Sequence, residues 1–176
     1  QGQIVTVWVA LFLLGKDTHA YRNTRHMLMY DAEGKEMLDL CPCHPDTPGY
    51  LSRTFLEMAQ KYNLDGYWLD FMDTLHVPCH AAHAHYTSSP GEGYNRCLAA
   101  VRDAVLKWKP DFLIETRMKM SNINVKQFAN VLETYDMPFD FDLNRGLGVF
   151  VKSFASGVAT KLDPVQWHMY ESNENV

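Results

Sequence analysis

Apolar residues along this chain follow two patterns that alternate. Short, nearly continuous apolar runs are typical of strands in a parallel sheet that is covered on both faces, and apolar residues spaced three and four apart indicate helices. The runs predict strands at residues 4–14, 66–71, 112–116, 131–135 and 158–162. The helical spacing predicts helices over 47–63 and 98–108 and shorter ones around 125–129 and 147–155. Strands that alternate with helices in this way predict right-handed βαβ units and a parallel α/β fold.

Two segments interrupt the alternation. Apolar residues at 27–30 and 36–40 flank Asp31-Ala-Glu-Gly34, which predicts a small hairpin inside an insertion at 15–46. Residues 72–93 are rich in His, Pro and Ser and directly follow the predicted strand 66–71, so we expect a long functional loop there. With these two insertions, residues 1–176 are expected to form a single domain.

Polar residues at the ends of the predicted strands favour a barrel over an open sheet. Asp70, Arg117, Asp136 and Asp163 each lie at or just after the carboxyl end of a strand, where parallel α/β proteins hold their chemistry. A glycine-rich phosphate motif follows none of these strands, which argues against nucleotide-binding open sheets. The sequence therefore predicts a (β/α)8 TIM-barrel type of fold. Because a complete barrel takes roughly 250 residues, 176 residues predict an incomplete one with about five of the eight strands.

Composition and charge narrow the range of partners. The chain is 47% hydrophobic, as in folded globular proteins, and its net charge of -5 with no Lys/Arg run excludes a nucleic-acid partner. The apolar run 4–14 is too short to span a bilayer, so no membrane partner is expected. The chain begins with Gln rather than Met, so we expect its natural beginning to be absent and leave its localisation open.

Two aspartates are the candidates for catalysis. Retaining glycoside hydrolysis needs an ionised carboxylate that attacks the anomeric carbon and a protonated one that assists the leaving oxygen. Asp70 follows a buried run, and Arg117 on the next strand is expected to keep it ionised by charge pairing. Asp136 precedes Met137-Pro138, which turns the chain away and leaves this carboxylate facing the same cavity. The alternative is that these aspartates only cap helices or stabilise turns.

Four motifs at successive strand ends, taken together, resemble those of α-galactosidase-like enzymes, the melibiase-type proteins of glycoside hydrolase clan D. The motifs are Asp65-Gly-Tyr-Trp-Leu-Asp-Phe71, Ile114-Glu-Thr-Arg117, Glu133-Thr-Tyr-Asp-Met-Pro-Phe-Asp140 with Asn144-Arg145, and Leu162-Asp-Pro-Val-Gln-Trp167. The resemblance runs in order from about residue 19 to residue 171. It implies a (β/α)8 barrel that acts on α-linked glycosides, with Asp70 as the nucleophile and Asp136 as the general acid/base. It implies no metal and no organic cofactor.

The resemblance also implies which residues surround the bound sugar and which glycosides belong to the substrate class. Arg117, Asp140, Arg145 and Asp163 fall where related proteins surround the sugar, and the rings of Trp68 and Trp167 are candidates for stacking on it. Many α-galactosidases carry Lys where this chain has Trp68, and a Trp there resembles the α-glucosidase and α-xylosidase side of the clan. We therefore expect a retaining hydrolase of α-linked galactosides or related glycosides. We expect its carbohydrate site to be completed by barrel strands or flanking domains of a longer parent protein, and leave open whether the isolated piece is active.

Two other functions stay open at this point. The first is a carbohydrate-binding barrel that performs no chemistry. The second is a zinc-binding domain that uses Cys41-Pro-Cys43-His44 and Cys79-His80-Ala-Ala-His83-Ala-His85, since thiolate and imidazole are the ligands zinc prefers. The spacings in these segments differ from the strong zinc patterns. The plainer interpretation is that the loop histidines donate hydrogen bonds to a sugar or lie on the loop surface, and that Cys79 and Cys97 are small buried hydrophobes.

Overall fold

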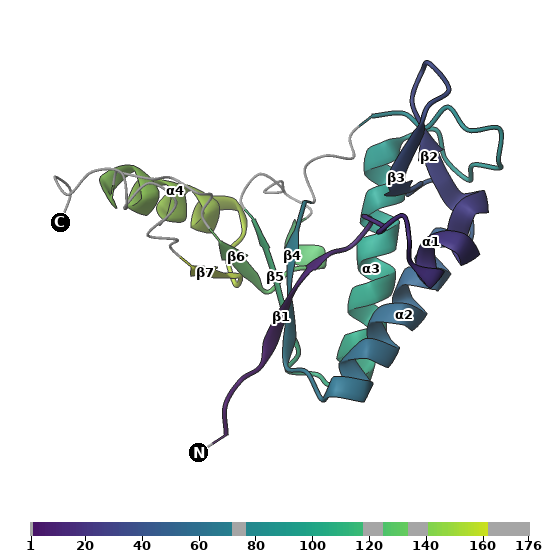
Figure 1. The fold of residues 1–176 in the computed structure, drawn as a ribbon. Helices are drawn as coiled ribbons and strands as arrows, with labels where there is room; N and C mark the ends of the chain where they lie inside the picture. Colours follow the sequence, from purple (N-terminus) through teal and green to yellow (C-terminus); the bar gives the residue numbers. More distant parts are fainter. Residues whose placement is uncertain (1, 72–76, 118–124, 134–140, 162–176) are drawn as a thin grey trace, which may run out of the picture. The chain divides into compact units, whose positions relative to one another are not determined.

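The computed structural model describes residues 2–71, 77–117, 125–133 and 141–161 (Figure 1). The chain divides into two compact units, Gln1–Phe112 and Leu113–Val176. No helix within the described ranges is long and apolar enough to cross a membrane. Each unit contains parallel strands and helices, so the predicted α/β class is confirmed.

The first unit is built on two parallel strands, β1 (Thr6–Ala10) and β4 (Gly66–Asp70). Their register pairs Trp8 with Trp68 and Ala10 with Asp70. Strand β1 is shorter than the predicted strand 4–14, because the second half of the apolar run leaves β4 and pairs with the inserted hairpin. There the N–H of Leu14 donates to the carbonyl of Leu38 at 2.8 Å. One apolar run therefore serves two different pairings.

The predicted hairpin is confirmed. Strands β2 (Leu28–Tyr30) and β3 (Glu36–Leu40) are antiparallel, and the Asp31 carboxylate accepts the N–H of Lys35 in the turn. A short helix, α1 (His19–Thr24), and a 3₁₀ turn, η1 (Arg25–Met27), precede it and were not predicted. A helix of six residues is too short to display an apolar period, and its signal is the Thr18 hydroxyl, which caps it by accepting the N–H of Tyr21.

Two long helices lie side by side in the first unit, α2 (Thr47–Tyr62) and α3 (Pro90–Trp108) (Figure 1). Helix α2 matches its prediction and ends at Asn63 in the left-handed conformation. Helix α3 begins at Pro90, eight residues before the predicted start, because Ser89 caps it by accepting the N–H of Glu92. The irregular loop predicted at 72–93 therefore ends at residue 89.

Strand β4 separates a core face from a site face. Tyr67 is fully buried on the helix side, where its ring contacts Phe55 of α2 and Phe112, and its hydroxyl donates to the Phe55 carbonyl. Since side chains alternate along a strand, Trp68 and Asp70 point to the opposite face. The packing of Tyr67 thus decides which way Asp70 faces.

The second unit contains three parallel strands in sequence order, β5 (Leu113–Arg117), β6 (Val131–Glu133) and β7 (Ala159–Lys161). The segment before β6 forms a 3₁₀ turn, η3 (Val125–Gln127), rather than the short helix predicted at 125–129. Helix α4 (Phe141–Phe154) begins six residues before the predicted range. The strand positions in this unit agree with the predicted runs to within about two residues, the usual uncertainty of element ends.

Candidate functional site

Asp70 is the last residue of β4, and donors hold both of its carboxylate oxygens. The indole N–H of Trp8 donates to Oδ2 at 2.9 Å, and the backbone N–H of Phe71 donates to Oδ1 at 2.8 Å. Phe71 adopts a left-handed backbone with φ of 53°, which turns the chain at the strand end. Its ring meets the Trp8 indole edge-on at 5.8 Å. The carboxylate is therefore fixed in orientation while remaining partly exposed.

Trp8 is a site residue that the sequence did not identify. It lies beside Trp68 in the parallel register, and 49% of its surface is exposed. Nothing in the apolar run 4–14 distinguishes this residue, because its link to Asp70 arises only when β1 pairs with β4. The side chain of Trp68, two residues before Asp70, is half-buried on the same face of β4.

In the second unit, a row of charged side chains crosses the carboxyl ends of the three strands. Arg117, Glu133 and Lys161 share one register row. The Arg117 Nε atom lies 3.9 Å from Glu133 Oε2, and the Lys161 Nζ atom lies 2.8 Å from Glu133 Oε1. Lys161 Nζ also donates to Glu115 Oε1 at 2.9 Å. Glu133, nearly fully buried, is thus held between two cations.

This row has a clear electrostatic consequence for Lys161. Burial alone would lower the pKa of the Lys161 ammonium, but hydrogen bonds to Glu133 and Glu115 outweigh it, so the pKa lies above its ordinary value. The sequence identified Arg117 but neither Glu133 nor Lys161 as site residues. Their signal is positional, since each is the last residue of its strand.

The remaining predicted site residues fall into two groups. Arg145 is exposed on helix α4 rather than at the end of a strand, and its contact with a sugar stays a prediction. Four predicted residues lie outside the described ranges, and their roles stay predictions as well: Asp136, Asp140, Asp163 and Trp167.

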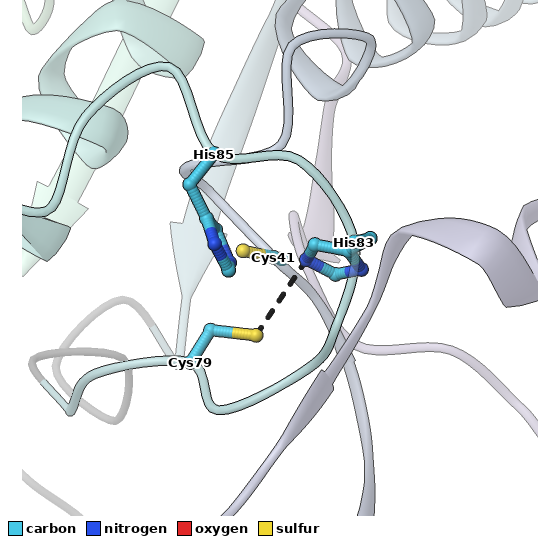
Figure 2. Close-up of side chains that lie close together, drawn as sticks. All are labelled: Cys41, Cys79, His83 and His85. Carbon is cyan, nitrogen blue, oxygen red and sulfur yellow. Dashed lines mark hydrogen bonds between the residues drawn. The ribbon is translucent and has the colours of Figure 1, made fainter.

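A second group of chemically active side chains gathers in the first unit. One ligand atom from each of Cys41, Cys79, His83 and His85 lies within 4.8 Å of the others. Figure 2 shows the four side chains turned toward one another, with the Cys79 Sγ atom 3.6 Å from His83 Nε2. We call these four residues the Cys/His cluster. It unites the two segments that the sequence offered as the zinc alternative.

Backbone hydrogen bonds join the loop that carries three of these residues to the hairpin and to the segment that follows it. The N–H of His80 donates to the Tyr30 carbonyl of β2 at 2.9 Å, and the N–H of Tyr86 donates to the Cys43 carbonyl at 3.0 Å. Cys41 follows β3 directly and is fully buried. A pocket of about 400 Å³, lined partly by Cys79 and His85, opens next to the cluster.

Burial shifts the titration of two cluster residues. Desolvation, reinforced by the nearby Cys79 thiol, raises the pKa of the Cys41 thiol far above its ordinary value. Desolvation, together with the neighbouring His44 and His85, lowers the pKa of His83 to about 4. His83 is therefore a neutral imidazole at physiological pH, which is the form that binds metal ions.

The predicted burial of two cysteines is half right. Cys97 is fully buried on α3, as expected of a small hydrophobe. Cys79 is only partly buried, because its loop lies at the surface and turns its thiol toward His83 instead of a core.

Helix α3 packs closely on the segment that precedes α2, and Gly93 makes this approach possible. A Cβ atom at Gly93 would lie 2.8 Å from the Pro42 carbonyl oxygen and 3.0 Å from the Cys43 Sγ atom. We expect Gly93→Ala to lower the free energy of unfolding by about 1–3 kcal/mol, the usual cost of overpacking, as measured by chemical denaturation. Gly91 lies two residues earlier in the same helix and is the matched control. A Cβ atom there meets no atom within 4 Å, so Gly91→Ala should leave stability equal or slightly higher. Equal stability of the two variants would contradict this packing.

No family model matches the chain, and no curated protein matches it. Solved structures do. Its fold is similar to that of an α-galactosidase from Lactobacillus brevis (TM-score 0.61, 17% identity), covering 86% of this chain and 21% of that one. It is similar to a GH31 family sulfoquinovosidase from E. rectale (TM-score 0.61, 15% identity), covering 78% of this chain and 22% of that one. A GH36 α-galactosidase from Geobacillus stearothermophilus gives a TM-score of 0.56 and 11% identity, covering 92% of this chain and 23% of that one.

These similarities establish the fold. The chain has part of the TIM-barrel fold of glycoside hydrolases and spans about a fifth of the length of these structures. The predicted partial (β/α)8 barrel is therefore confirmed, while identities this low leave activity and specificity as separate questions.

Proposed function

We propose that this chain is part of the catalytic barrel of a retaining glycoside hydrolase that acts on α-linked galactosides or related α-glycosides. The observation that carries the proposal is the setting of Asp70, whose carboxylate ends β4 and accepts hydrogen bonds from Trp8 and Phe71. Barrel enzymes hold their catalytic groups at the carboxyl ends of strands. The similarity of fold to two α-galactosidases and a sulfoquinovosidase supports the same assignment.

The proposed reaction is a double displacement. The Asp70 carboxylate attacks the anomeric carbon and forms a glycosyl ester, while Asp136 gives its proton to the departing oxygen. Asp136 then takes a proton from water, and the resulting hydroxide displaces Asp70 at the anomeric carbon with net retention. Fixed donors suit the first step, because they hold the attacking oxygens in one orientation.

Other residues in the proposal hold the substrate. Trp68, on the same face of β4 as Asp70, is a platform for a sugar ring. The residues proposed to contact the sugar are Trp68, Arg117, Asp140, Arg145, Asp163 and Trp167. Because Trp68 stands where many α-galactosidases have Lys, α-glucosides belong among the substrates to be tried.

We further propose that strands or domains of a longer parent protein complete this site. The chain spans 21% to 23% of the length of the three similar structures, so most of their scaffold has no counterpart here. The residues just before β1, Ile4 and Val5, also expose their apolar side chains, as expected at the edge of an incomplete barrel.

A trapping experiment on the parent protein tests the mechanism. A fluorinated α-glycosyl fluoride should form the glycosyl ester quickly and release it slowly, so we expect one label per molecule, located by peptide mass spectrometry on Asp70. Nuclear magnetic resonance of the first product should show the α anomer. A β-anomeric first product, or a label on a different carboxylate, would refute the assignment. Sugar binding without label or hydrolysis would favour the carbohydrate-binding barrel.

A further inference from the structure

We infer that the Cys/His cluster binds one Zn²⁺ ion in a closed, structural site, with Cys41, Cys79, His83 and His85 as its four ligands. The inference does not depend on the glycosidase proposal, since none of the four is assigned a part in sugar chemistry. It would give the chain a metal centre that joins the loop after β4 to the hairpin inserted after β1.

The geometry of the ligand atoms carries the inference. Zinc bonds of about 2.3 Å to sulfur and about 2.0 Å to nitrogen place neighbouring tetrahedral ligands roughly 3.3–3.8 Å apart. The 3.6 Å between Cys79 Sγ and His83 Nε2 already has this spacing. No pair in the cluster exceeds 4.8 Å, so side-chain movements of about an ångström close the tetrahedron. The convergence of all four side chains is visible in Figure 2.

The donor set suits zinc in both chemistry and charge. Two thiolates and two neutral imidazoles form one of the standard sets of structural zinc sites, and four protein ligands leave no open position for catalysis. Two thiolates also balance the charge of the ion, which matters because Cys41 is fully buried. Binding requires the two thiols to lose their protons to solvent.

Neighbouring residues that could compete as ligands have other partners. The Cys43 thiol lies 3.6 Å from the Ser89 carbonyl oxygen, to which it donates, and the His44 Nδ1 atom accepts the N–H of Asp46 at 3.1 Å. The His44 ring instead packs edge-on against His83, with ring centres 4.8 Å apart. These contacts select Cys41 over Cys43, and they orient the His83 ring.

The loop itself gives a reason for the metal. Residues 77–89 contain neither helix nor strand, and long irregular segments of this kind need other support to hold one conformation. Two backbone hydrogen bonds anchor the loop, His80 on β2 and Tyr86 on the segment after β3, and the ligands lie between or beside these anchors. A zinc ion would fasten the middle of the loop.

The test is metal analysis of the purified chain, which is produced in the presence of zinc and then dialysed to remove unbound metal. Each ligand variant is compared with a matched control variant. We expect close to one Zn²⁺ per chain, and we expect Cys41→Ala and His85→Ala to lose it, with an affinity at least about 10- to 100-fold weaker. Their matched controls, Cys43→Ala from the same buried turn and His80→Ala from the same exposed loop, should keep it. Replacing Zn²⁺ with Co²⁺ should give the thiolate charge-transfer and tetrahedral d–d absorption bands.

Cobalt titration of the wild-type chain tests thiolate ligation without any substitution. The inference can therefore be tested even if a variant fails to fold. Zinc content well below one per chain, or a cobalt spectrum without thiolate bands, would overturn the inference. Equal loss of zinc in the ligand and control variants would overturn the ligand set. A Cys41–Cys79 disulfide would overturn it as well. Thiol counting would detect this disulfide in the metal-free chain, as a bond that persists in reducing buffer whether or not zinc is added.

Discussion

Asp70→Asn in the complete parent protein is expected to lower kcat by at least about 10³-fold, because an amide cannot form the glycosyl ester. Stability should change by no more than about 1 kcal/mol, since Asn has the same shape and keeps one acceptor for the Trp8 or Phe71 donor. Initial rates on α-galactosides and α-glucosides, together with chemical denaturation, measure both effects. Wild-type turnover in Asp70→Asn would remove the basis of the proposed function.

Asp65→Asn is the matched control, at the opposite end of the same strand. Asp65 forms a salt bridge with Lys109, and its carboxylate also accepts the N–H of Val5 at 2.7 Å. Residues at this end of barrel strands serve stability. We therefore expect the folded Asp65→Asn protein to keep its kcat while its melting temperature falls.

The pH dependence of this control has a definite sign. The hydrogen bond from Lys109, and then the one from Val5, lower the pKa of Asp65. The folded state thus binds this proton more weakly than the unfolded chain, in which the pKa is about 3.9. The stabilisation is complete above that value and is lost as the pH falls through the lowered folded pKa. Asp65→Asn should therefore lose less stability on acidification than the wild type.

Tyr67→Ala is expected to lower the free energy of unfolding of the chain by about 3–5 kcal/mol, the usual cost of removing a large aromatic side chain from a core. Tyr67 is fully buried, and its ring contacts Phe55 and Phe112 at centre distances of 5.2 and 5.0 Å. Urea denaturation followed by circular dichroism measures the change. A loss this large is a substantial fraction of the stability of a typical domain.

Two further variants separate packing from hydrogen bonding. Tyr67→Phe keeps the ring but loses the hydroxyl that donates to the Phe55 carbonyl, so we expect a loss of about 0.5–1.5 kcal/mol. Tyr62→Ala, on the same helix as Phe55 but 62% exposed, should change stability by about 0.5 kcal/mol at most. Similar effects of Tyr67→Ala and Tyr62→Ala would contradict the core face assigned to β4.

Local periodicity predicted the regular elements well where they were long. Helix α2 and strand β4 match their predicted ranges closely, because each contains its own apolar pattern and its own end signal. The start of α3 was missed because its first turns are set by a Ser89 cap and by the close approach of Gly93 to Pro42. The apolar run 4–14 predicts one strand, but its second half pairs with β3, and no local pattern reveals that pairing.

The residues of the candidate site also differ in whether a local pattern or only long-range pairing identifies them. The sequence identified Asp70 and Arg117, because a polar residue after a buried run is visible to local reasoning. It missed Trp8 and Lys161, because the partner of Trp8 is 62 residues away along the chain and those of Lys161 are 46 and 28 residues away. It named both segments of the Cys/His cluster but could not choose the ligands, because their spacing fits no short pattern.

The sequence by itself determined the α/β class, the parallel strands, the inserted hairpin and the position of Asp70 at a strand end. These features depend on interactions within a few residues, such as side-chain alternation and capping. Only the tertiary structure decided which groups meet: the Trp8 indole with Asp70, Glu133 between two cations, and Cys41 with three residues of a loop about forty positions later. Such meetings are set by strand register and by loop anchoring, which are long-range properties that local spacing does not encode.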